Sequence, residues 1–101
     1  MFRHVVLLRF VPEATPAQRA AVLDGLSGLP AAIPELRSYV FGPDAGISTG
    51  NFDLAVVADF DDEAGYQVYA TDPEHLTVIA ERIRPILADR AAVQYVVPAS
   101  G

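Results

Sequence analysis

The stretch HVVLLRFV, residues 4–11, indicates the fold class, because it has the pattern of a strand with two apolar faces. A nearly continuous run of Val and Leu is typical of a strand that is covered on both sides. Side chains alternate along a strand, so one face carries His4, Val6, Leu8 and Phe10. The opposite face carries Arg3, Val5, Leu7 and Arg9. One face should therefore build the core of the chain, and the other should meet a second cover.

A helix signature follows in ATPAQRAAVLDGLSGLP, residues 14–30. Thr15 is suited to cap this helix, with Pro16 at its first position and Gln18 completing a capping box. The apolar face that the helical spacing predicts consists of Val22, Leu23, Leu26 and Leu29. Gly28 and Pro30 are expected to end the helix.

The middle of the chain contains two further predicted strands, LRSYVFG at residues 36–42 and NFDLAVVADF at residues 51–60. The segment PDAGISTGN between them is a loop by composition. EAGYQVYAT, residues 63–71, predicts a short, weak helix, because Gly65 costs about 1 kcal/mol relative to Ala inside a helix.

The longest helix is expected in DPEHLTVIAERIRPILADR, residues 72–90. Asp72 is suited to cap it and Pro73 to occupy its first position. Pro85 is expected to kink the helix or to end it early. The apolar stripe is predicted to consist of Leu76, Ile79, Ile83 and either Ile86 or Leu87. The last strand is AAVQYVVP, residues 91–98.

This order of elements, strand–helix–strand–strand–helix–strand, is that of the ferredoxin-like α+β fold. A βαββαβ chain of this kind forms a four-stranded antiparallel sheet with helices on one face. Residues 1–101 are enough for a single domain. The open face of the sheet also needs a cover, and the simplest cover is the sheet of a second copy. We therefore predict a homodimer through the sheet faces, a dimeric α+β barrel.

Composition and motifs argue against several kinds of partner and site. The net charge is −6 and the pI is about 4.6, with no basic patch, so nucleic acid and anionic membranes are poor partners. The chain has no cysteine, and its two histidines lack metal-ligand spacing, so no metal site is expected. No nucleotide or phosphate-loop motif occurs, and no cofactor is expected. The first apolar run is short and is broken by Arg9, which favours a cytoplasmic protein without a membrane span.

The segment YATDPEH, residues 69–75, contains the candidate site. With Asp72 as the N-cap, His75 occupies the third helical position, where the positive end of the helix disfavours imidazolium. The Asp72 carboxylate opposes this effect unless backbone amides occupy it, so the direction of the His75 pKa shift stays open. A neutral His75 could act as a general base, and Tyr69 could donate a hydrogen bond to a substrate oxygen. His4, on an otherwise apolar strand face, needs a partner or a pocket.

The same residues also have structural interpretations. A histidine near a helix start is commonly a surface or capping residue, and Tyr66 and Tyr69 are commonly aromatics at the edge of a core. Four carboxylates around the end of the third strand have the composition of a metal site but no ligand spacing, and a solvated strand-to-helix turn explains them better. They are Asp59, Asp61, Asp62 and Glu63.

Several motifs together suggest a family. They are HVVLLRF at the start, FG at residues 41–42, the FDLAVVADF strand, the Y-x-x-x-P-x-H pattern of Tyr69, Pro73 and His75, and the final apolar strand. Each motif is weak alone, but their order and spacing extend over nearly the whole chain. In these features the chain resembles the stress-responsive A/B barrel domain (Dabb) family of the dimeric α+β barrel superfamily.

The resemblance implies a homodimer in which each subunit has a pocket between its sheet and its helices. In a plant polyketide cyclase of this family, a histidine and a tyrosine that match His75 and Tyr69 take a proton and bind a substrate oxygen. A histidine that matches His4 lies near that pocket. The implied ligand is small and apolar, phenolic or polyketide-like. By position, the apolar wall would consist of Val6, Leu8, Leu23, Leu26, Val78 and Ile86.

The chain departs from the family pattern in two places near the site. Many members read H-P-x-H where this chain has D-P-E-H, so Asp72 replaces an imidazole. The cyclase has an acidic residue in its last strand that could polarise a histidine. Here the polar candidates in that strand are Gln94 and Tyr95, and their register is open.

Three functions are consistent with these residues. The first is a cofactor-free enzyme that cyclises or isomerises a small β-dicarbonyl or phenolic substrate, with His75 as base, Tyr69 binding the oxygen and His4 as a secondary polar contact. The second is a non-catalytic, stress-responsive dimer that binds a small molecule. The third is a cofactor-independent monooxygenase, which is disfavoured because the chain lacks the other polar residues that such pockets usually carry.

Overall fold

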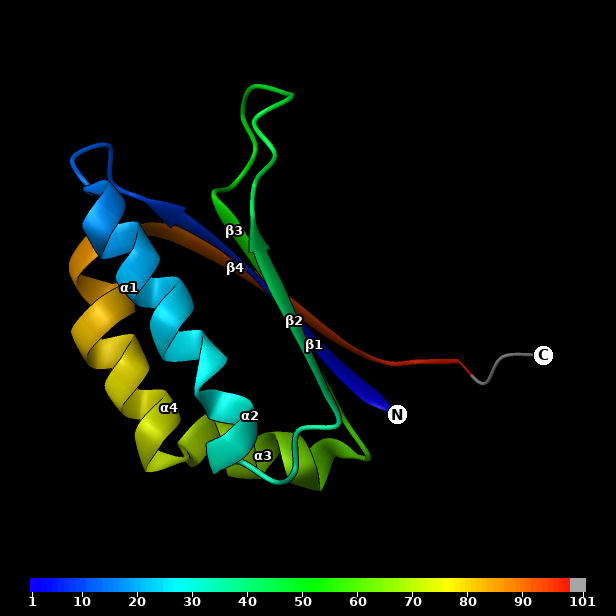
Figure 1. Ribbon diagram of the computed structural model, residues 1–101. Helices are drawn as coiled ribbons and strands as arrows, with labels where there is room; N and C mark the ends of the chain where they lie inside the picture. The colour runs from blue at the N-terminus through cyan, green and yellow to red at the C-terminus, as the bar shows by residue number, and fades with distance from the viewer. Residues whose placement is uncertain (99–101) are drawn as a thin grey trace.

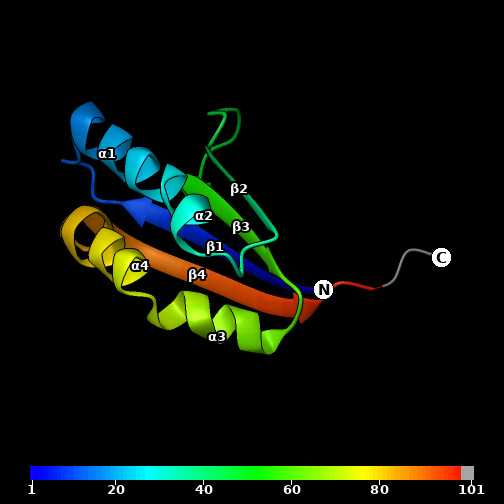
Figure 2. The same ribbon diagram turned by 60° about the horizontal axis from the view of Figure 1, so that its bottom comes forward.

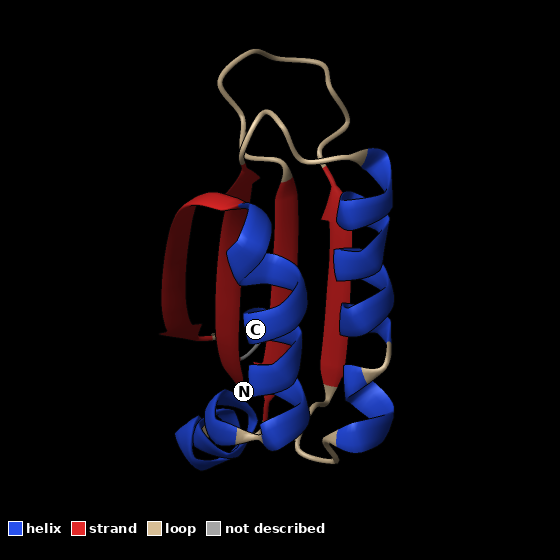
Figure 3. Ribbon diagram, turned by 90° about the vertical axis from the view of Figure 1, so that its left-hand side faces the viewer, coloured by secondary structure: helices blue, strands red, loops and turns tan. Residues whose placement is uncertain are grey.

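The strands of the chain form one antiparallel sheet in the order β2-β3-β1-β4, as seen in the computed structural model, which describes residues 1–98 (Figure 1). Their bounds are β1 (Phe2–Phe10), β2 (Ser38–Pro43), β3 (Leu54–Phe60) and β4 (Leu87–Val96). All helices cover the same face of this sheet (Figures 2 and 3). They are α1 (Pro16–Ser27), α2 (Leu29–Ala32), α3 (Glu63–Thr71) and α4 (Pro73–Val78), followed by a π turn, η1 (Ile79–Ile83), and a 3-10 turn, η2 (Arg84–Ile86). The ferredoxin-like α+β prediction is confirmed.

The two faces of β1 differ as the alternation predicts. His4, Val6, Leu8 and Phe10 are buried beneath the helices, whereas the residues between them are only half-buried. On α1 the buried side chains are Val22 and Leu26. These residues pack with Phe60 of β3 into the core, which therefore lies between the sheet and the helix layer.

The predicted caps form as expected and explain where the helices begin. The Thr15 hydroxyl accepts a hydrogen bond from the Gln18 amide, and the Gln18 side chain accepts one from the Thr15 amide. The Asp72 carboxylate accepts hydrogen bonds from the amides of Glu74 and His75 at 2.9 and 3.4 Å, so it is occupied by backbone donors. Pro30 follows the end of α1 and also lies in the first turn of α2. Its missing N–H costs no hydrogen bond there, because the amides of a first turn have no partner within the helix.

The early end expected at Pro85 is confirmed, but the inclusion of residues 87–90 in the predicted helical segment is wrong. The helical segment ends at Ile86, next to Pro85, and residues 87–90 open β4 instead. Proline lacks the amide that a continuing helix needs, and the Ile86 carbonyl accepts a hydrogen bond from the Val11 amide of the chain after β1. Pairing with β1 then draws Leu87–Val96 into the sheet. Arg90 therefore lies on a strand and not on a helix.

The predicted apolar stripe of this helix is also wrong at Leu76, which is 48% exposed. Neighbouring residues on a helix point in directions about 100° apart, so Leu76 cannot face the sheet when His75 does. Val78 is buried instead, and Ile83 is buried as predicted. The strands predicted at 36–42 and 51–60 are observed at Ser38–Pro43 and Leu54–Phe60. The later start of the second strand reflects a loop that extends to Asp53.

The face of the sheet away from the helices is open and largely apolar. The strand registers align four valines in one row across it: Val40, Val57, Val5 and Val93. Val40 is 63% and Val93 57% exposed. The neighbouring row is polar and contains the ion pair of Arg3 with the buried Asp59, at 2.7 and 3.0 Å. Among residues 1–98, no helix has both the length and the apolar character needed to cross a bilayer.

Candidate functional site

A cavity of about 250 Å³ lies between the helix-covered face of the sheet and the helices. Most of its lining is apolar: Val6, Leu8, Leu26, Val56, Ala70, Ile79, Ile83 and Leu87. Its polar lining residues are His4, Tyr39, Tyr66, Tyr69, His75 and Arg90. An apolar cavity with a few convergent polar groups is the usual form of a small-molecule site.

Tyr69 and His75 form a stacked pair in this cavity. Their ring centroids are 3.9 Å apart with an interplanar angle of 29°. Tyr69 lies in the last turns of α3 and His75 in the first turn of α4. Asp72, in extended conformation, ends α3 and begins α4, so the chain turns between the two rings and brings them face to face.

His75 is neutral at pH 7 because burial lowers its pKa. The Arg90 guanidinium also lowers this pKa, whereas the carbonyls of Tyr69 and Ala70 and the Asp72 carboxylate oppose the shift without reversing it. The sequence alone leaves the direction of the His75 pKa shift open; in the structure the pKa is lowered, mainly by burial. The His75 Nδ1 atom is buried and has no hydrogen-bond partner among residues 1–98. An unpartnered buried nitrogen is costly, so the packing of the core alone does not account for this atom.

The Tyr69 hydroxyl lies 3.2 Å from the hydroxyl of Tyr39 on β2, where either oxygen can donate. Burial raises the pKa of both phenols above the ordinary tyrosine range. Both hydroxyls therefore keep their protons at neutral pH. A protonated Tyr69 can donate a hydrogen bond to an oxygen in the cavity while it accepts one from Tyr39.

His4 is 4% exposed, and its Nδ1 accepts a hydrogen bond from the Gln94 amide nitrogen at 3.0 Å. Its ring centroid lies 4.9 Å from that of Tyr66 and 6.3 Å from that of Tyr69. Burial, with smaller effects of Arg90 and His75, lowers the pKa of His4 to about 4. Gln94 thus supplies the partner that a buried histidine needs. Tyr95, the other candidate in the strand, faces the open side of the sheet beside Arg3.

Arg90 is the charged residue of the cavity lining, and it is exposed. It pairs in register with the buried Leu8 of β1, so its side chain projects toward the helix-covered face. Sequence analysis missed Arg90 because it placed residue 90 in a helix. Tyr39 and Tyr66 also line the cavity. The alternation of Tyr39 with Val40 in a short strand was the available signal for Tyr39.

The predicted candidates are only partly brought together. His4, Tyr69, His75, Val6, Leu8 and Leu26 all line the cavity. Leu23 does not, because it faces a separate surface hollow beside Phe41. Val78 packs toward Gly25 of α1, where an added Cβ would lie 3.1 Å from its methyl group. Ile86 is buried in the core at the end of the helical segment and is absent from the lining.

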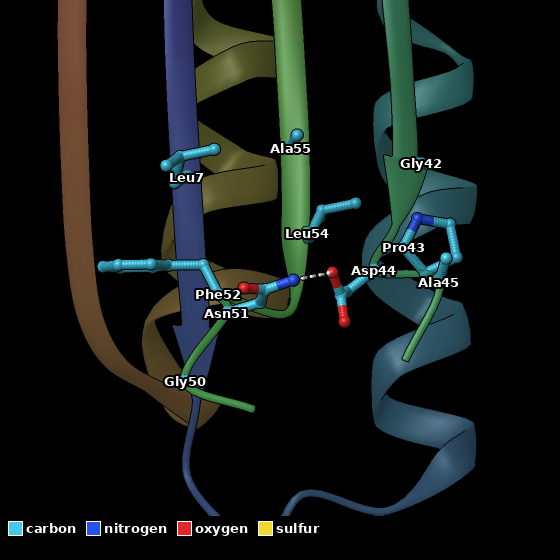
Figure 4. Close-up of a pocket in the computed structure, with 10 residues that line it drawn as sticks. All are labelled: Leu7, Gly42, Pro43, Asp44, Ala45, Gly50, Asn51, Phe52, Leu54 and Ala55. Carbon is cyan, nitrogen blue, oxygen red and sulfur yellow. Dashed lines mark hydrogen bonds between the residues drawn. The ribbon is translucent and has the colours of Figure 1, made fainter. Parts of the chain in front are cut away.

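A second hollow, of about 520 Å³, lies beside the loop between β2 and β3 (Figure 4). Leu7, Gly42 and Ala55 of the open sheet face contribute to it. Its acidic residue, Asp44, accepts a hydrogen bond from the Asn51 side chain at 3.0 Å. None of the histidines or tyrosines lines this hollow.

The carboxylates around the end of β3 have separate structural roles. Asp59 pairs with Arg3, and Asp61 pairs with Arg37 at 2.9 and 3.0 Å. The Asp62 side chain accepts a hydrogen bond from the Gly65 amide and caps α3. Within residues 1–98, no group of three or more metal-ligating side chains is arranged to hold a metal ion.

The chain is thus a ferredoxin-like α+β domain with a cavity beneath its helices that is lined by histidine and tyrosine side chains. The chain belongs to the stress-responsive A/B barrel domain (Dabb) family, whose sequence profile matches residues 2–97. No curated protein is similar to the chain in sequence.

Solved structures agree with this family. A dimeric ferredoxin-like protein of unknown function from Thermobifida fusca is 49% identical, with a TM-score of 0.88 over 95% of this chain and 90% of that chain. A Dabb family protein from Mesorhizobium loti is 17% identical, with a TM-score of 0.79 over 97% of each chain. A hydroxynitrile lyase from Passiflora edulis is 19% identical, with a TM-score of 0.83 over 99% of this chain and 95% of that chain. At these lower identities the similarity is one of fold.

Proposed function

We propose that this protein is a cofactor-free enzyme that transfers a proton on a small carbonyl compound, leading to cyclisation or isomerisation. The observation that carries the proposal is the stacking of His75 on Tyr69 in one mostly apolar cavity, with the buried His75 Nδ1 left without a partner among residues 1–98. A lowered histidine pKa favours the free base, and burial favours the un-ionised phenol. The two groups therefore have the complementary protonation states that such chemistry needs.

In the proposed reaction, His75 removes a proton from the carbon next to a substrate carbonyl. The electrons of the broken C–H bond form an enolate, whose oxygen accepts a hydrogen bond from Tyr69. The enolate carbon then attacks a second carbonyl of the same molecule, and the imidazolium returns its proton to the new alkoxide. Tyr39 stabilises Tyr69 through the hydroxyl contact of 3.2 Å. A donor aimed at the developing negative charge would supply much of the rate enhancement.

The proposal can be tested before the substrate is known, by measuring α-proton exchange. NMR in D₂O would follow deuterium uptake into a panel of small β-dicarbonyl compounds. We expect His75→Ala to slow the catalysed exchange roughly 10²- to 10⁴-fold, the usual contribution of a general base. Tyr69→Phe should also slow it, whereas the exposed neighbour Glu74→Gln should not. The proposal fails if the wild-type protein exchanges every compound at the rate of His75→Ala.

The pH dependence of the same exchange has a definite sign. Because the His75 pKa lies below its ordinary value, activity should persist into mildly acidic solution and fall only when His75 becomes protonated. Because the Tyr69 pKa is raised, the alkaline loss should begin above the ordinary tyrosine range. An acidic limb centred above the ordinary histidine range would contradict the assignment of His75 as the base.

A second candidate is a non-catalytic binding protein, favoured by the mostly apolar lining of the cavity. In that case His75→Ala would change neither ligand binding nor α-proton exchange. If the wild type and His75→Ala bind the same ligand and show equal exchange rates, the protein is this binding protein and not the enzyme.

We also propose that the chain forms a homodimer through the open sheet face. The row of valines that includes Val40 and Val93 supplies an exposed apolar strip, and such a patch on a soluble protein commonly marks an interface. The relative from Thermobifida fusca, at 49% identity, is described as dimeric. Size-exclusion chromatography with light scattering should give twice the chain mass of 10.8 kDa.

A further inference from the structure

The charge distribution around the cavity is uneven. Its lining contains one arginine, Arg90, and no aspartate or glutamate. The chain as a whole carries a net charge of −6, so the surroundings of the protein repel anions. The charge of the cavity lining, which comes from Arg90, is therefore opposite in sign to the net charge of the chain.

Arg90 also differs from most other arginines in its contacts. Arg3, Arg19, Arg37 and Arg82 each lie within 4 Å of an aspartate carboxylate. Arg9 lies over the Phe52 ring, with 4.4 Å from its guanidinium carbon to the ring centroid. Within residues 1–98, the structure gives the Arg90 guanidinium no hydrogen bond and no ion pair; the Asp89 carboxylate accepts its hydrogen bond from the Arg90 backbone amide. Its five donors are therefore available to a ligand.

The position of Arg90 relates it to the reactive groups. It lines the same cavity as His4 and His75, and its charge lowers the pKa of both. Leu8, its partner in register, also lines the cavity. A molecule that reaches from Arg90 to the Tyr69–His75 pair would therefore lie along apolar wall, with a polar group at each end.

We propose that Arg90 binds the carboxylate of the ligand, so that the substrate class of this cavity is a small apolar oxo acid. The planar guanidinium matches a carboxylate with two parallel hydrogen bonds. The apolar chain or ring of the ligand fills the cavity, and its carbonyl lies between Tyr69 and His75. The carboxylate site stands on Arg90 and the apolar lining, whereas the reactive carbonyl rests on the proposed function above.

Binding experiments with simple probes test the carboxylate site. The probes are octanoate and octanamide, which differ in charge but hardly in shape, measured by calorimetry and by NMR of the histidine rings. We expect the wild-type protein to bind octanoate roughly tenfold more tightly, which corresponds to one charge-assisted hydrogen-bonded contact. Arg90→Gln should abolish this preference, and Arg90→Lys should keep part of it.

Arg84→Gln is the matched control, because Arg84 is exposed and lies outside this cavity. This substitution removes the same positive charge as Arg90→Gln. It should keep the preference for octanoate. Salt provides a test without any variant, since octanoate affinity should fall with ionic strength while octanamide affinity should not. Bound octanoate should also raise the pKa of His75 by offsetting the Arg90 charge. Equal binding of both probes, an equal loss in Arg84→Gln, or salt-independent octanoate binding would overturn the proposal.

The two proposals fail in different ways. If octanoate binds through Arg90 but no oxo acid exchanges its α-proton, the carboxylate site stands and the enzymatic function does not. If neutral β-dicarbonyl compounds exchange through His75 equally well in the wild type and in Arg90→Gln, and octanoate shows no preference, the function stands and the carboxylate site does not.

Discussion

The polar groups on the two faces of the sheet differ in whether they have hydrogen-bond partners within the chain. On the open face, the Arg3 guanidinium and the Asp59 carboxylate bind each other at 2.7 and 3.0 Å, and the apolar row beside them is exposed at Val40 and Val93. On the helix-covered face, the apolar residues are buried, and His75 retains a buried nitrogen with no partner among residues 1–98. Both faces are built from the same four strands.

This difference teaches how to separate structural from functional polar groups. Polar atoms that satisfy one another, as Arg3 and Asp59 do, stabilise the fold and offer nothing to a ligand. Polar atoms that remain unsatisfied inside an apolar cavity, as in His75, have a cost that folding alone does not explain. The helix-covered face is therefore the candidate site, and the open face is the candidate interface. The predictions below test this division, from the largest expected change in stability to the smallest.

Phe60→Ala should have the largest effect. Phe60 is fully buried on the helix-covered face, and its ring lies 5.4 Å from that of Tyr69 and 5.9 Å from that of Tyr66. Removing it leaves a cavity, so the free energy of unfolding should fall by about 3–5 kcal/mol in urea denaturation. Val68→Ala on the exposed side of α3 is the control and should change it by less than about 0.5 kcal/mol.

Acid should destabilise the protein through His4. Its pKa is about 4 when folded and 6.5 in its ordinary state, so between these values the unfolded chain binds more protons. The stability is fully present above pH 6.5 and is lost as the pH falls toward 4, by about 2–3 kcal/mol. His4→Gln should remove this part of the pH dependence. An unchanged slope in that variant, measured by denaturation at several pH values, would refute the assignment.

Arg3→Met tests the paired groups of the open face. It leaves the buried Asp59 carboxylate without its partner, which should cost about 1–3 kcal/mol of unfolding free energy. The double variant Arg3→Met with Asp59→Leu should recover most of this loss, because no unpaired charge remains. α-Proton exchange at His75 should be unaffected in the folded double variant, since the pair lies on the opposite face.

Val40→Lys should have the smallest effect on the folding of the single chain, within about 0.5 kcal/mol, because the residue is exposed there. Its expected effect is on assembly: light scattering should show dissociation of the proposed dimer. Leu76→Lys, exposed on the helix side, is the control and should leave assembly unchanged. Dissociation by Leu76→Lys alone would place the interface on the helices.

Much of the fold could be predicted because its signals are local. The alternation along residues 4–11, the Thr15 capping box and the Asp72 cap each involve residues within a few positions of one another. The error at residues 87–90 arose where local and long-range signals compete. Helical propensity extends to Arg90, but pairing with β1 takes these residues into the sheet.

The candidate site was predictable only in its local part. Tyr69 and His75 are six positions apart and share the Asp72 turn, so their pairing follows from the helix boundaries. Tyr39, Gln94 and Arg90 reach the site from strands distant in sequence, and only the strand registers place them there. The family resemblance implied that Leu23, Val78 and Ile86 line the pocket wall, but their directions depend on how α1, α4 and η2 pack.

From its sequence alone, the chain specifies the order of its elements, its family and the turn that joins Tyr69 to His75, because periodicity, caps and prolines act over short distances. Tertiary structure decided the rest. It buried His75 and so gave its pKa a downward direction, paired His4 with Gln94 across 90 positions, and brought Arg90 to the cavity. Burial and the distances between remote groups exist only once the sheet has formed, and these quantities govern charge and reactivity.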